Sequence, residues 1–520
     1  MKTSALEYLL DTALAHRARI AVETVDEQLS YEELVRAAAA LRATLAARFP
    51  VRGRPVAILM KKSPAALAAI AATLMSGNIY CPVDAGAPPE RIAAILASLG
   101  ESFILADDAG ARVLAQLGLE PAGFEHVTWP LAEARADAAD AEPALEALVA
   151  AARAGIADVL DLDPCYIIFT SGSTGVPKGV TIAQRGVLDY IDWANGVYRI
   201  GPDDIVGSQA PLYFDNSTLD LYLCWSNGAR FHIIPDKTFA FPKTVVEHLA
   251  RHAITTIFWV PSLLAQIAAL QLLDGAALPR LRRVLFAGEA MPARTLKYWM
   301  ARHPDAVYSN LYGPTEITVD CTYYMVPPGW DGDSVPIGIP CRNAGILVLG
   351  EDDLPADEGE LCVRGSGVAL GYWNDAGKSD AAFVQNPLQR SYRDIVYRTG
   401  DIVRRQDGLL YFIGRKDHQI KHNGYRIELG EIEAAAGAVD AVGACVAGYD
   451  PARRQIYLAV AAADDAALER IGLLKALAAR LPKYMLPTRI EFLPALPLTP
   501  NRKFDRKAVH QLVCQAYIPT

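Results

Sequence analysis

The sequence has none of the features that mark a membrane-spanning or secreted protein. Its longest apolar run, Pro64 to Met75, is shorter than the roughly 20 residues that a helix needs to cross a bilayer. The N-terminal region carries acidic residues early and shows no apolar segment followed by a cleavage site of small residues. We therefore expect a soluble, unprocessed, cytoplasmic protein.

The sequence also lacks a long basic run. It contains 50 Lys and Arg against 59 Asp and Glu, which gives a net charge of −9. Such a balance disfavours wrapping a nucleic acid or lying on an anionic membrane. The expected partners therefore include neither a nucleic acid polymer nor a membrane.

The eight cysteines form no C-x-x-C pair and show no zinc-ligand spacing. In a chain of this length, scattered cysteines indicate reduced and mostly buried thiols rather than a disulfide framework. No repeat of 20–50 residues is present either, which excludes a solenoid or propeller.

What the sequence does contain is an ordinary globular composition, with 52% apolar and 21% charged residues. At roughly 150 residues per domain, 520 residues correspond to about three to four folding units. Strand-like segments alternate with helix-like segments in the first half, as in PVAILM (residues 55–60) before SPAALAAIAATLMSG (residues 63–77). This alternation predicts an α/β protein with a layered core.

The pattern changes along the chain. Short β-rich runs such as AGILVLG and LLYFIG dominate from about residue 335 to 416, and a final stretch alternates strand-like and helix-like segments. We predict an α/β fold with a large N-terminal core over residues 1–416, which includes a β-rich subdomain at about 335–416. A small α+β domain is predicted over residues 417–520.

The most informative segment is YIIFTSGSTGVPKGV, Tyr166 to Val180, in which a strand leads into a loop rich in Ser, Thr and Gly. Glycines let a backbone approach a ligand closely, hydroxyl and N–H groups supply donors, and Lys178 supplies a positive charge. The loop has neither the G-x-x-x-x-G-K-[ST] spacing nor a G-x-S-x-G motif. It therefore suits a polyphosphate but predicts neither a P-loop nor a serine nucleophile.

TSGSTGVPKGV resembles the phosphate loop of the adenylate-forming superfamily, and five more motifs of that superfamily follow in order. They are NLYGPTEITV (310–319), GELCVRGSGVALGYWN (359–374), YRTGD (397–401), GRKDHQIKHNGYRIELGEIE (414–433) and PLTPNRKFDRKAV (497–509). The resemblance covers essentially the whole chain and is strongest to nonribosomal peptide synthetase-type adenylation domains and amino acid:carrier-protein ligases. Two positions depart from the pattern: Gln184 stands where His is common, and Arg502 where Gly is usual.

The resemblance implies that a carboxylate attacks the α-phosphate of ATP to give an acyl adenylate and pyrophosphate. Mg2+ would be held by Glu316, and the catalytic residues would be Lys503, Thr315 and Lys178. The resemblance also implies an ATP site in which Tyr312 stacks on adenine and Asp401 accepts the ribose hydroxyls. The full set of expected ATP-binding residues is Thr170, Ser171, Gly172, Ser173, Thr174, Gly175, Asn310, Tyr312, Gly313, Asp401 and Arg415.

The same resemblance implies a second half-reaction after the C-terminal domain rotates. Asp417 matches the hinge, and Lys421 and Gly424 lie in the segment expected to serve thioester formation. The acceptor is the phosphopantetheine thiol of a carrier protein. No carrier motif follows Val509, so we expect a free-standing ligase whose carrier is supplied in trans.

Asp215 narrows the substrate class, because amino acid-activating members carry an aspartate at this place. A carboxylate in an apolar pocket requires a cationic partner, here the α-ammonium of an amino acid. The other expected substrate-binding residues are Asn216, Leu219, Phe258, Leu285, Ala287, Leu311, Val319 and Asp320. Most are apolar and bulky, so a small or polar amino acid is expected, with serine and alanine first and a diamino acid as the alternative.

Two other functions stay open at this point. An acyl-CoA synthetase of the same superfamily is disfavoured by Asp215, and a noncatalytic binding protein is disfavoured by the presence of Lys503, Glu316, Lys178 and Asp401. His248 and His252 have metal-like spacing but no glutamate of an HExxH motif between them. We interpret them as part of a solvated helix face, and His418 and His422 as structural.

Overall fold

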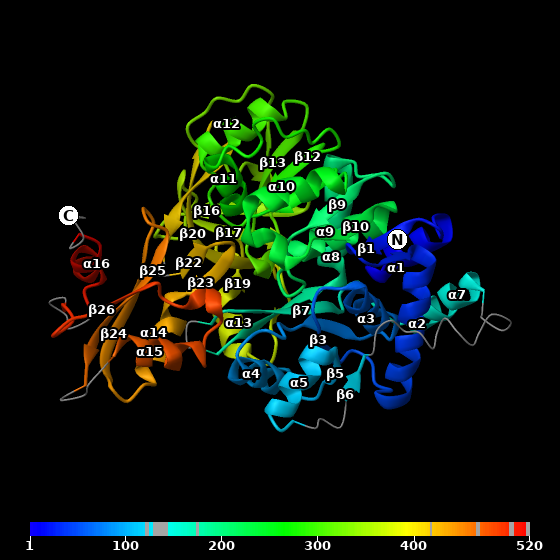
Figure 1. Ribbon diagram of the computed structural model, residues 1–520, viewed down its shortest axis with the longest axis horizontal. Helices are drawn as coiled ribbons and strands as arrows, with labels where there is room; N and C mark the ends of the chain where they lie inside the picture. Colours follow the sequence, from blue (N-terminus) through cyan, green and yellow to red (C-terminus); the bar gives the residue numbers. More distant parts are fainter. Residues whose placement is uncertain are drawn as a thin grey trace. The chain divides into compact units, whose positions relative to one another are not determined.

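The computed structural model describes residues 1–119, 124–127, 144–172, 176–416, 419–463, 469–498 and 504–515 (Figure 1). These residues form two compact units. The large unit comprises Met1–Ala85, Ser98–Ile168 and Gly179–Lys416, and the small unit comprises Gly86–Ala97, Phe169–Lys178 and Asp417–Thr520. The small unit therefore also contains the phosphate-loop segment.

A nine-stranded sheet organises the large unit, in the order β15-β14-β13-β12-β11-β9-β10-β1-β2. Its six neighbouring strands from β13 to β1 run parallel, as expected where helices connect strands. The strands are β1 (Ile20–Glu23), β2 (Gln28–Ser30), β9 (Ile205–Ser208), β10 (Arg230–Ile233), β11 (Thr256–Trp259), β12 (Arg283–Phe286), β13 (Val307–Tyr312), β14 (Thr322–Val326) and β15 (Ile339–Pro340).

Helices connect these strands. They are α8 (Gln184–Tyr198), α9 (Asn216–Asn227), η1 (Asp236–Ala240), α10 (Pro242–Arg251), α11 (Pro261–Ala269), α12 (Ala293–Arg302) and the 3-10 turn η2 (Thr315–Ile317). Alternate residues of one strand enter different cores because side chains alternate across a sheet. Phe258 and Leu285 belong to one buried cluster, whereas their neighbours Trp259 and Phe286 belong to another.

A seven-stranded sheet has the order β18-β8-β7-β4-β3-β5-β6. Its strands are β3 (Pro55–Leu59), β4 (Ile79–Pro82), β5 (Phe103–Ala106), β6 (Phe124–His126), β7 (Pro164–Thr170), β8 (Lys178–Ala183) and β18 (Gly371–Tyr372). The described helices that precede β7 in the chain are α1 (Leu6–Ala15), α2 (Tyr31–Arg48), α3 (Pro64–Met75), α4 (Pro89–Leu99), α5 (Asp108–Gln116) and α7 (Leu145–Gly155).

The longest apolar run of the sequence is helix α3, all of whose residues are buried. Ser63 begins the helix by accepting a hydrogen bond from the Ala66 N–H, and Pro64 suits the first turn because it has no N–H to satisfy. No helix among the described residues is long and apolar enough to cross a membrane.

The β-rich part of the large unit is an antiparallel sheet in the order β16-β17-β20-β19, with β21 also paired to β20. Its elements are β16 (Ala344–Leu349), β17 (Glu358–Gly365), α13 (Ala376–Ala382), β19 (Phe383–Gln385), β20 (Ile395–Gln406) and β21 (Leu409–Arg415). Strand β20 presents the YRTGD motif, so this sheet positions Asp401.

The small unit has its own core, which includes Ile427, Ile432 and Leu458. Its C-terminal elements are β22 (Gln419–His422), β23 (Tyr425–Glu428), α14 (Leu429–Gly437), β24 (Val442–Asp450), β25 (Gln455–Ala462), α15 (Arg470–Ala478), η3 (Lys483–Met485), β26 (Arg489–Phe492) and α16 (Arg506–Gln515). Asn423 and Gly424 form the two-residue turn between β22 and β23, with φ of 52° and 82°. Asn-Gly is the preferred pair for such a turn because both residues need positive φ.

The predicted fold class, an α/β core with a β-rich region and a small α+β part, is confirmed. All eight cysteines are free and six are buried, as the sequence predicted.

Candidate active site

Three parallel strands of the large unit present the expected apolar pocket residues. Phe258 on β11 lies beside Leu285 on β12 in the parallel register, and Leu285 lies beside Ser309 on β13. Leu311 is two residues beyond Ser309 and therefore faces the same side of the sheet. These side chains belong to one buried cluster together with the other apolar residues predicted for the pocket, Leu219, Ala287 and Val319.

Asp215 and Asn216 begin helix α9 and are half-buried. The Asp215 side chain does not cap the helix, although the backbone carbonyl of Asp215 accepts a hydrogen bond from the Thr218 N–H at 2.8 Å. A carboxylate at this end of a helix is favoured by the helix dipole. Burial raises the pKa of the Tyr166 hydroxyl, and the negative charge of Asp215 raises it further. The negative charge of Asp215 therefore influences a buried side chain of the large unit.

Lys62 holds the loop that leads from β9 toward Asp215. Its ammonium donates to the carbonyl oxygens of Ser208, Gln209 and Ala210 at 3.1, 3.1 and 3.0 Å. Burial lowers the pKa of Lys62 and raises that of Asp220, the buried carboxylate on α9 whose charge acts on Lys62. No sequence motif contains Lys62, whose partners lie 146 to 148 residues further along the chain.

The loop after β13 is strained and closely packed. Thr318 and Val319 both have positive φ, 62° and 68°, which is unfavourable for β-branched residues. A Cβ added at Gly313 would lie 2.3 Å from the Val319 carbonyl oxygen, and one added at Gly186 would lie 2.6 Å from Thr318 Oγ1. The glycines therefore allow the close approach that fixes this loop.

Glu316 lies in the same loop and is completely buried. Its Oε1 atom accepts a hydrogen bond from the Tyr372 hydroxyl at 2.9 Å, and Thr315 beside it is also buried. A carboxylate oxygen is the kind of ligand that Mg2+ prefers. The position of Glu316 thus fits the expected metal ligand in its chemistry, and Tyr372, a residue of the third motif, is its hydrogen-bond partner.

Asp320 ends the loop and is buried beside α8. Its Oδ2 atom accepts a hydrogen bond from the Tyr190 hydroxyl at 2.6 Å. Burial raises the pKa of Tyr190 well above its usual value, and Asp320 raises it further, so the hydroxyl stays a donor. Both residues line a small cavity of about 30 Å³ that Trp193 and Cys341 also border. No sequence motif contained Tyr190.

Asp401 on β20 is the centre of a buried polar group. It accepts hydrogen bonds from the Tyr312 hydroxyl and the Arg415 guanidinium, and Arg415 lies opposite it in the strand register. A carboxylate has about four acceptor positions, so positions remain for ribose hydroxyls.

Asn310 belongs to the same motif as Tyr312. Its side-chain amide donates to the Pro336 carbonyl at 2.7 Å and so connects β13 to the following loop.

The small unit contains the described part of the phosphate loop. The buried Thr170 Oγ1 has no hydrogen-bond partner among the residues that the structure describes, whereas Ser171 Oγ donates to the Arg426 carbonyl at 3.0 Å. A Cβ added at Gly172 would lie 2.0 Å from the Val176 carbonyl oxygen. An orphaned hydroxyl beside a tightly closed glycine loop fits a phosphate ligand.

The structure also describes three other predicted site residues of the small unit. Lys178 begins β8, Lys421 lies opposite Arg426 in the β22–β23 hairpin, and Gly424 lies in its turn. The remaining predicted residues, Ser173, Thr174, Gly175, Asp417 and Lys503, lie outside the described residues, as does His418.

One expectation is wrong. His248 does not belong to a solvated helix face, since it is only 7% exposed and contacts the imidazole of the buried His232. Burial lowers the pKa of His248 to about 4, with His252 and His232 lowering it further, so its imidazole is neutral at pH 7. The helical spacing of His248 and His252 was identified correctly, but it could not predict that strand β10, with His232, covers this face of the helix.

His422, which was interpreted as structural, is buried beside Asn423.

Comparison with known proteins defines the class. Residues 9–373 match the model of the family described as AMP-binding enzyme, and the chain belongs to this family. It is an AMP-forming amino acid adenylating ligase, and the family implies the use of ATP.

Two curated relatives illustrate the similarity. The chain is 36% identical over 518 residues to the L-proline--[L-prolyl-carrier protein] ligase of Streptomyces coelicolor, covering 95% of this chain and 94% of that protein. It is 32% identical to tyrocidine synthase 3 of Brevibacillus parabrevis over 97% of this chain but only 8% of the synthase. The chain thus matches one relative over nearly its whole length and the other over a short part.

Two solved structures share the fold. The Vibrio cholerae adenylation domain AlmE, solved in complex with glycyl-adenosine-5'-phosphate, has a TM-score of 0.82 at 25% identity and covers 99% of this chain and 98% of its own. IdnL1 has a TM-score of 0.78 at 27% identity, with 96% and 99% of the two chains covered.

Proposed function

We propose that the protein activates a small or polar α-amino acid with ATP and Mg2+ and transfers it to the phosphopantetheine thiol of a separate carrier protein. In the first step a carboxylate oxygen of the amino acid attacks the α-phosphorus, the bond to the bridging oxygen breaks, and pyrophosphate leaves. In the second step the thiol sulfur attacks the carbonyl carbon, loses its proton, and AMP leaves.

The observation that carries this proposal is the start of helix α9. Asp215 places a carboxylate there, and Leu219, one helical turn later, belongs to the buried apolar cluster that contains Phe258 and Leu285. A negative group next to an apolar wall suits a molecule with an ammonium and a short side chain. A fatty acid or aryl acid offers no charge for Asp215.

The ATP-binding roles follow the chemistry of the residues present. Glu316 would hold Mg2+, which neutralises phosphate charge when bound. Asp401 would accept the ribose hydroxyls, and Tyr312 would lie against the adenine. The Thr170 hydroxyl, with Ser171, Gly172 and Lys178, would bind phosphate oxygens.

The remaining roles belong to the C-terminal part of the chain. Lys503 would stabilise the charge that builds between the substrate carboxylate and the α-phosphate, as a mobile point charge can. Asp417 would be the hinge for a rotation of the small domain over residues 417–520, which brings Lys421 and Gly424 into use for thioester formation.

The proposed substrate size rests on packing. The six apolar pocket residues are all at most 3% exposed, so little room is left for a large side chain. The names of two similar proteins agree with a small substrate, since one refers to proline and the other to a glycyl adenylate. Asn216 and Asp320 are the polar groups that a hydroxyl or a second ammonium would meet.

An amino acid-dependent ATP–pyrophosphate exchange assay tests the proposal. The panel contains glycine, alanine, serine, proline, 2,3-diaminopropionate, phenylalanine and tryptophan, with decanoate plus coenzyme A as a separate arm. We expect exchange with one or more of the first five. Exchange only with the aromatic amino acids would refute the substrate size, and activity only with decanoate would refute the function.

A further inference from the structure

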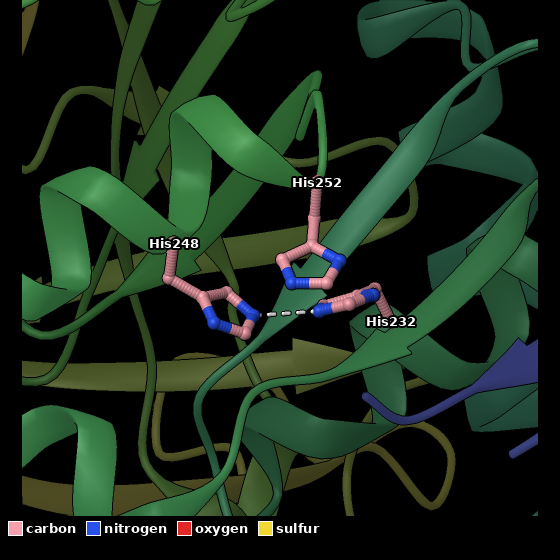
Figure 2. A group of neighbouring side chains, drawn as sticks. All are labelled: His232, His248 and His252. Carbon is pink, nitrogen blue, oxygen red and sulfur yellow. Dashed lines mark hydrogen bonds between the residues drawn. The ribbon is translucent and has the colours of Figure 1, made fainter. Parts of the chain in front are cut away.

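Three imidazoles converge in the large unit, at residues that none of the proposed adenylation roles uses. His232, His248 and His252 each place a ring nitrogen within 4.8 Å of the others (Figure 2). The Nε2 atoms of His232 and His248 are 2.7 Å apart, and the rings of His248 and His252 are stacked with centroids 4.2 Å apart. The three rings thus surround one point.

Well-ordered elements hold these rings. His232 lies on strand β10 between β9 and β1, His248 lies on helix α10, and His252 directly follows the last residue of that helix, Arg251. A separation of four residues places both side chains on the same side of a helix. The strand supplies one ligand and the helix end two, so the geometry depends on the packing of α10 and not on a loop.

Glu23 on β1 sets the tautomer of His232. Its Oε1 atom lies 2.8 Å from His232 Nδ1, and Glu23 is the register partner of His232 between the parallel strands. The carboxylate accepts a hydrogen bond from Nδ1–H, so Nδ1 carries the hydrogen and Nε2 presents its lone pair toward His248. A carboxylate behind a histidine is the usual outer partner of a metal-bound imidazole.

We propose that His232, His248 and His252 form a binding site for one divalent transition-metal ion of the zinc type. Two nitrogens bound to tetrahedral zinc at 2.0–2.1 Å lie about 3.3 Å apart, so the His232–His248 pair at 2.7 Å opens by about 0.6 Å on binding. His252 is half-exposed and gives the ion a route from solvent. A water molecule completes the coordination.

The donor set selects the kind of ion. Three neutral imidazoles suit Zn2+, Co2+, Ni2+ and Cu2+, whereas Mg2+ prefers oxygen ligands. Excess Mg2+ therefore saturates an oxygen-ligand site such as the one proposed at Glu316 and leaves the histidines available. The ion would join β10 and β1 to α10 and stabilise the folded state, because the unfolded chain does not hold the three rings together.

The test uses the full-length protein after EDTA treatment and gel filtration. The protein is dialysed against a small molar excess of ZnCl2 with excess MgCl2, and bound zinc is measured by mass spectrometry of the metal. We expect one zinc per chain in the wild type and loss of this zinc in His252→Asn. The matched control is His126→Asn, which removes a histidine of the same unit that pairs with Asp108 outside the cluster.

Two further measurements keep the proposal falsifiable if a variant folds poorly. Glu23→Gln retains all three ligands and should weaken zinc binding about 10- to 100-fold in competition with a chromophoric chelator. Co2+ should give the visible absorption of a tetrahedral nitrogen site. Zinc retention in His252→Asn equal to that in His126→Asn, or wild type that retains no zinc, would overturn the proposal.

Discussion

Two groups of ionisable side chains, most of them buried, lie beside the nine-stranded sheet and differ in kind. Beside β13, Glu316, Asp320 and Asp401 are carboxylates that each accept a hydrogen bond from a tyrosine hydroxyl. Beside β10, the buried groups are imidazoles that contact one another. A hydrogen bond from a tyrosine hydroxyl occupies one lone pair of a carboxylate but does not neutralise its negative charge. Neutral imidazoles, in contrast, offer nitrogen lone pairs and carry no charge. The first group therefore suits charged ligands and the second suits a metal ion with nitrogen preference.

The two groups also differ in their backbone. The carboxylates Glu316 and Asp320 flank Thr318 and Val319, which are held at positive φ by close packing against glycines. The histidines lie on a regular strand and at the end of a regular helix. Strained backbone is thus present in the loop that carries the carboxylates, whereas His232, His248 and His252 do not have positive φ.

The largest expected effect is that of Glu316→Gln. The change keeps the shape and the acceptor for Tyr372 but removes the charge, so Mg2+ and its phosphate oxygens lose their protein ligand. We expect the exchange rate to fall about 10²- to 10³-fold. Glu358→Gln, at an exposed carboxylate of the same unit, is the control, and equal activity of the two variants would contradict the proposed role of Glu316 as a Mg2+ ligand.

Asp215→Asn should act on amino acid binding. A neutral amide cannot pair with the ammonium, and loss of one member of a desolvated charge pair costs at least about 2 kcal/mol, or roughly 30-fold in kcat/KM for the amino acid. The KM for ATP should not change. Asp203→Asn, at an exposed aspartate that pairs with Arg19, controls for loss of charge. A parallel rise in both KM values would contradict the assignment.

Two glycines of helix α8 provide a matched pair. Gly186→Ala places a methyl group against the buried Thr318 hydroxyl and should lower the free energy of unfolding by about 1–3 kcal/mol. It should also slow pyrophosphate exchange by about tenfold or more, because the loop that carries Glu316 shifts. The Cβ added in Gly196→Ala would meet no neighbouring atom within 4 Å. This variant should raise the free energy of unfolding by about 0.4–1 kcal/mol and leave pyrophosphate exchange unchanged. Urea unfolding and the exchange assay distinguish them.

The smallest effect on activity is expected at the histidines. Addition of Zn2+ to EDTA-treated protein should raise the thermal midpoint by a few degrees and leave exchange at saturating Mg2+ unchanged. In His252→Asn the midpoint should not respond to Zn2+. If His252→Asn lost pyrophosphate exchange but kept normal stability, the histidines beside β10 would be coupled to the carboxylates beside β13. The two groups would then not be functionally separate.

These two groups also show what the sequence could predict. Residues 310–320 are contiguous, so a motif carries Asn310, Tyr312, Thr315 and Glu316 together. The histidine cluster combines Glu23, His232 and a helix end, and only the pair His248 and His252 had a recognisable spacing. Parallel strand order brings β1 next to β10, and local patterns do not encode that order.

Hydrogen-bond partners were missed for the same reason. Tyr190 lies 130 residues from Asp320, and Lys62 lies 146 residues from Ser208. Tyr372, in contrast, lies inside the third motif. The apolar pattern of residues 63–77 correctly predicted a helix, which the structure shows as the buried α3.

The left-handed backbone at Val319 bears on how the substrate preference of such a protein could be altered. A β-branched residue at positive φ costs about 1–3 kcal/mol, which Gly or Asn would largely avoid. Replacing Val319 by one of these residues would lose packing energy, but the relief of backbone strain would offset part of that loss. Leu285 on its regular strand offers no such compensation, so Val319 is the position at which the pocket can be widened with the smaller loss of stability.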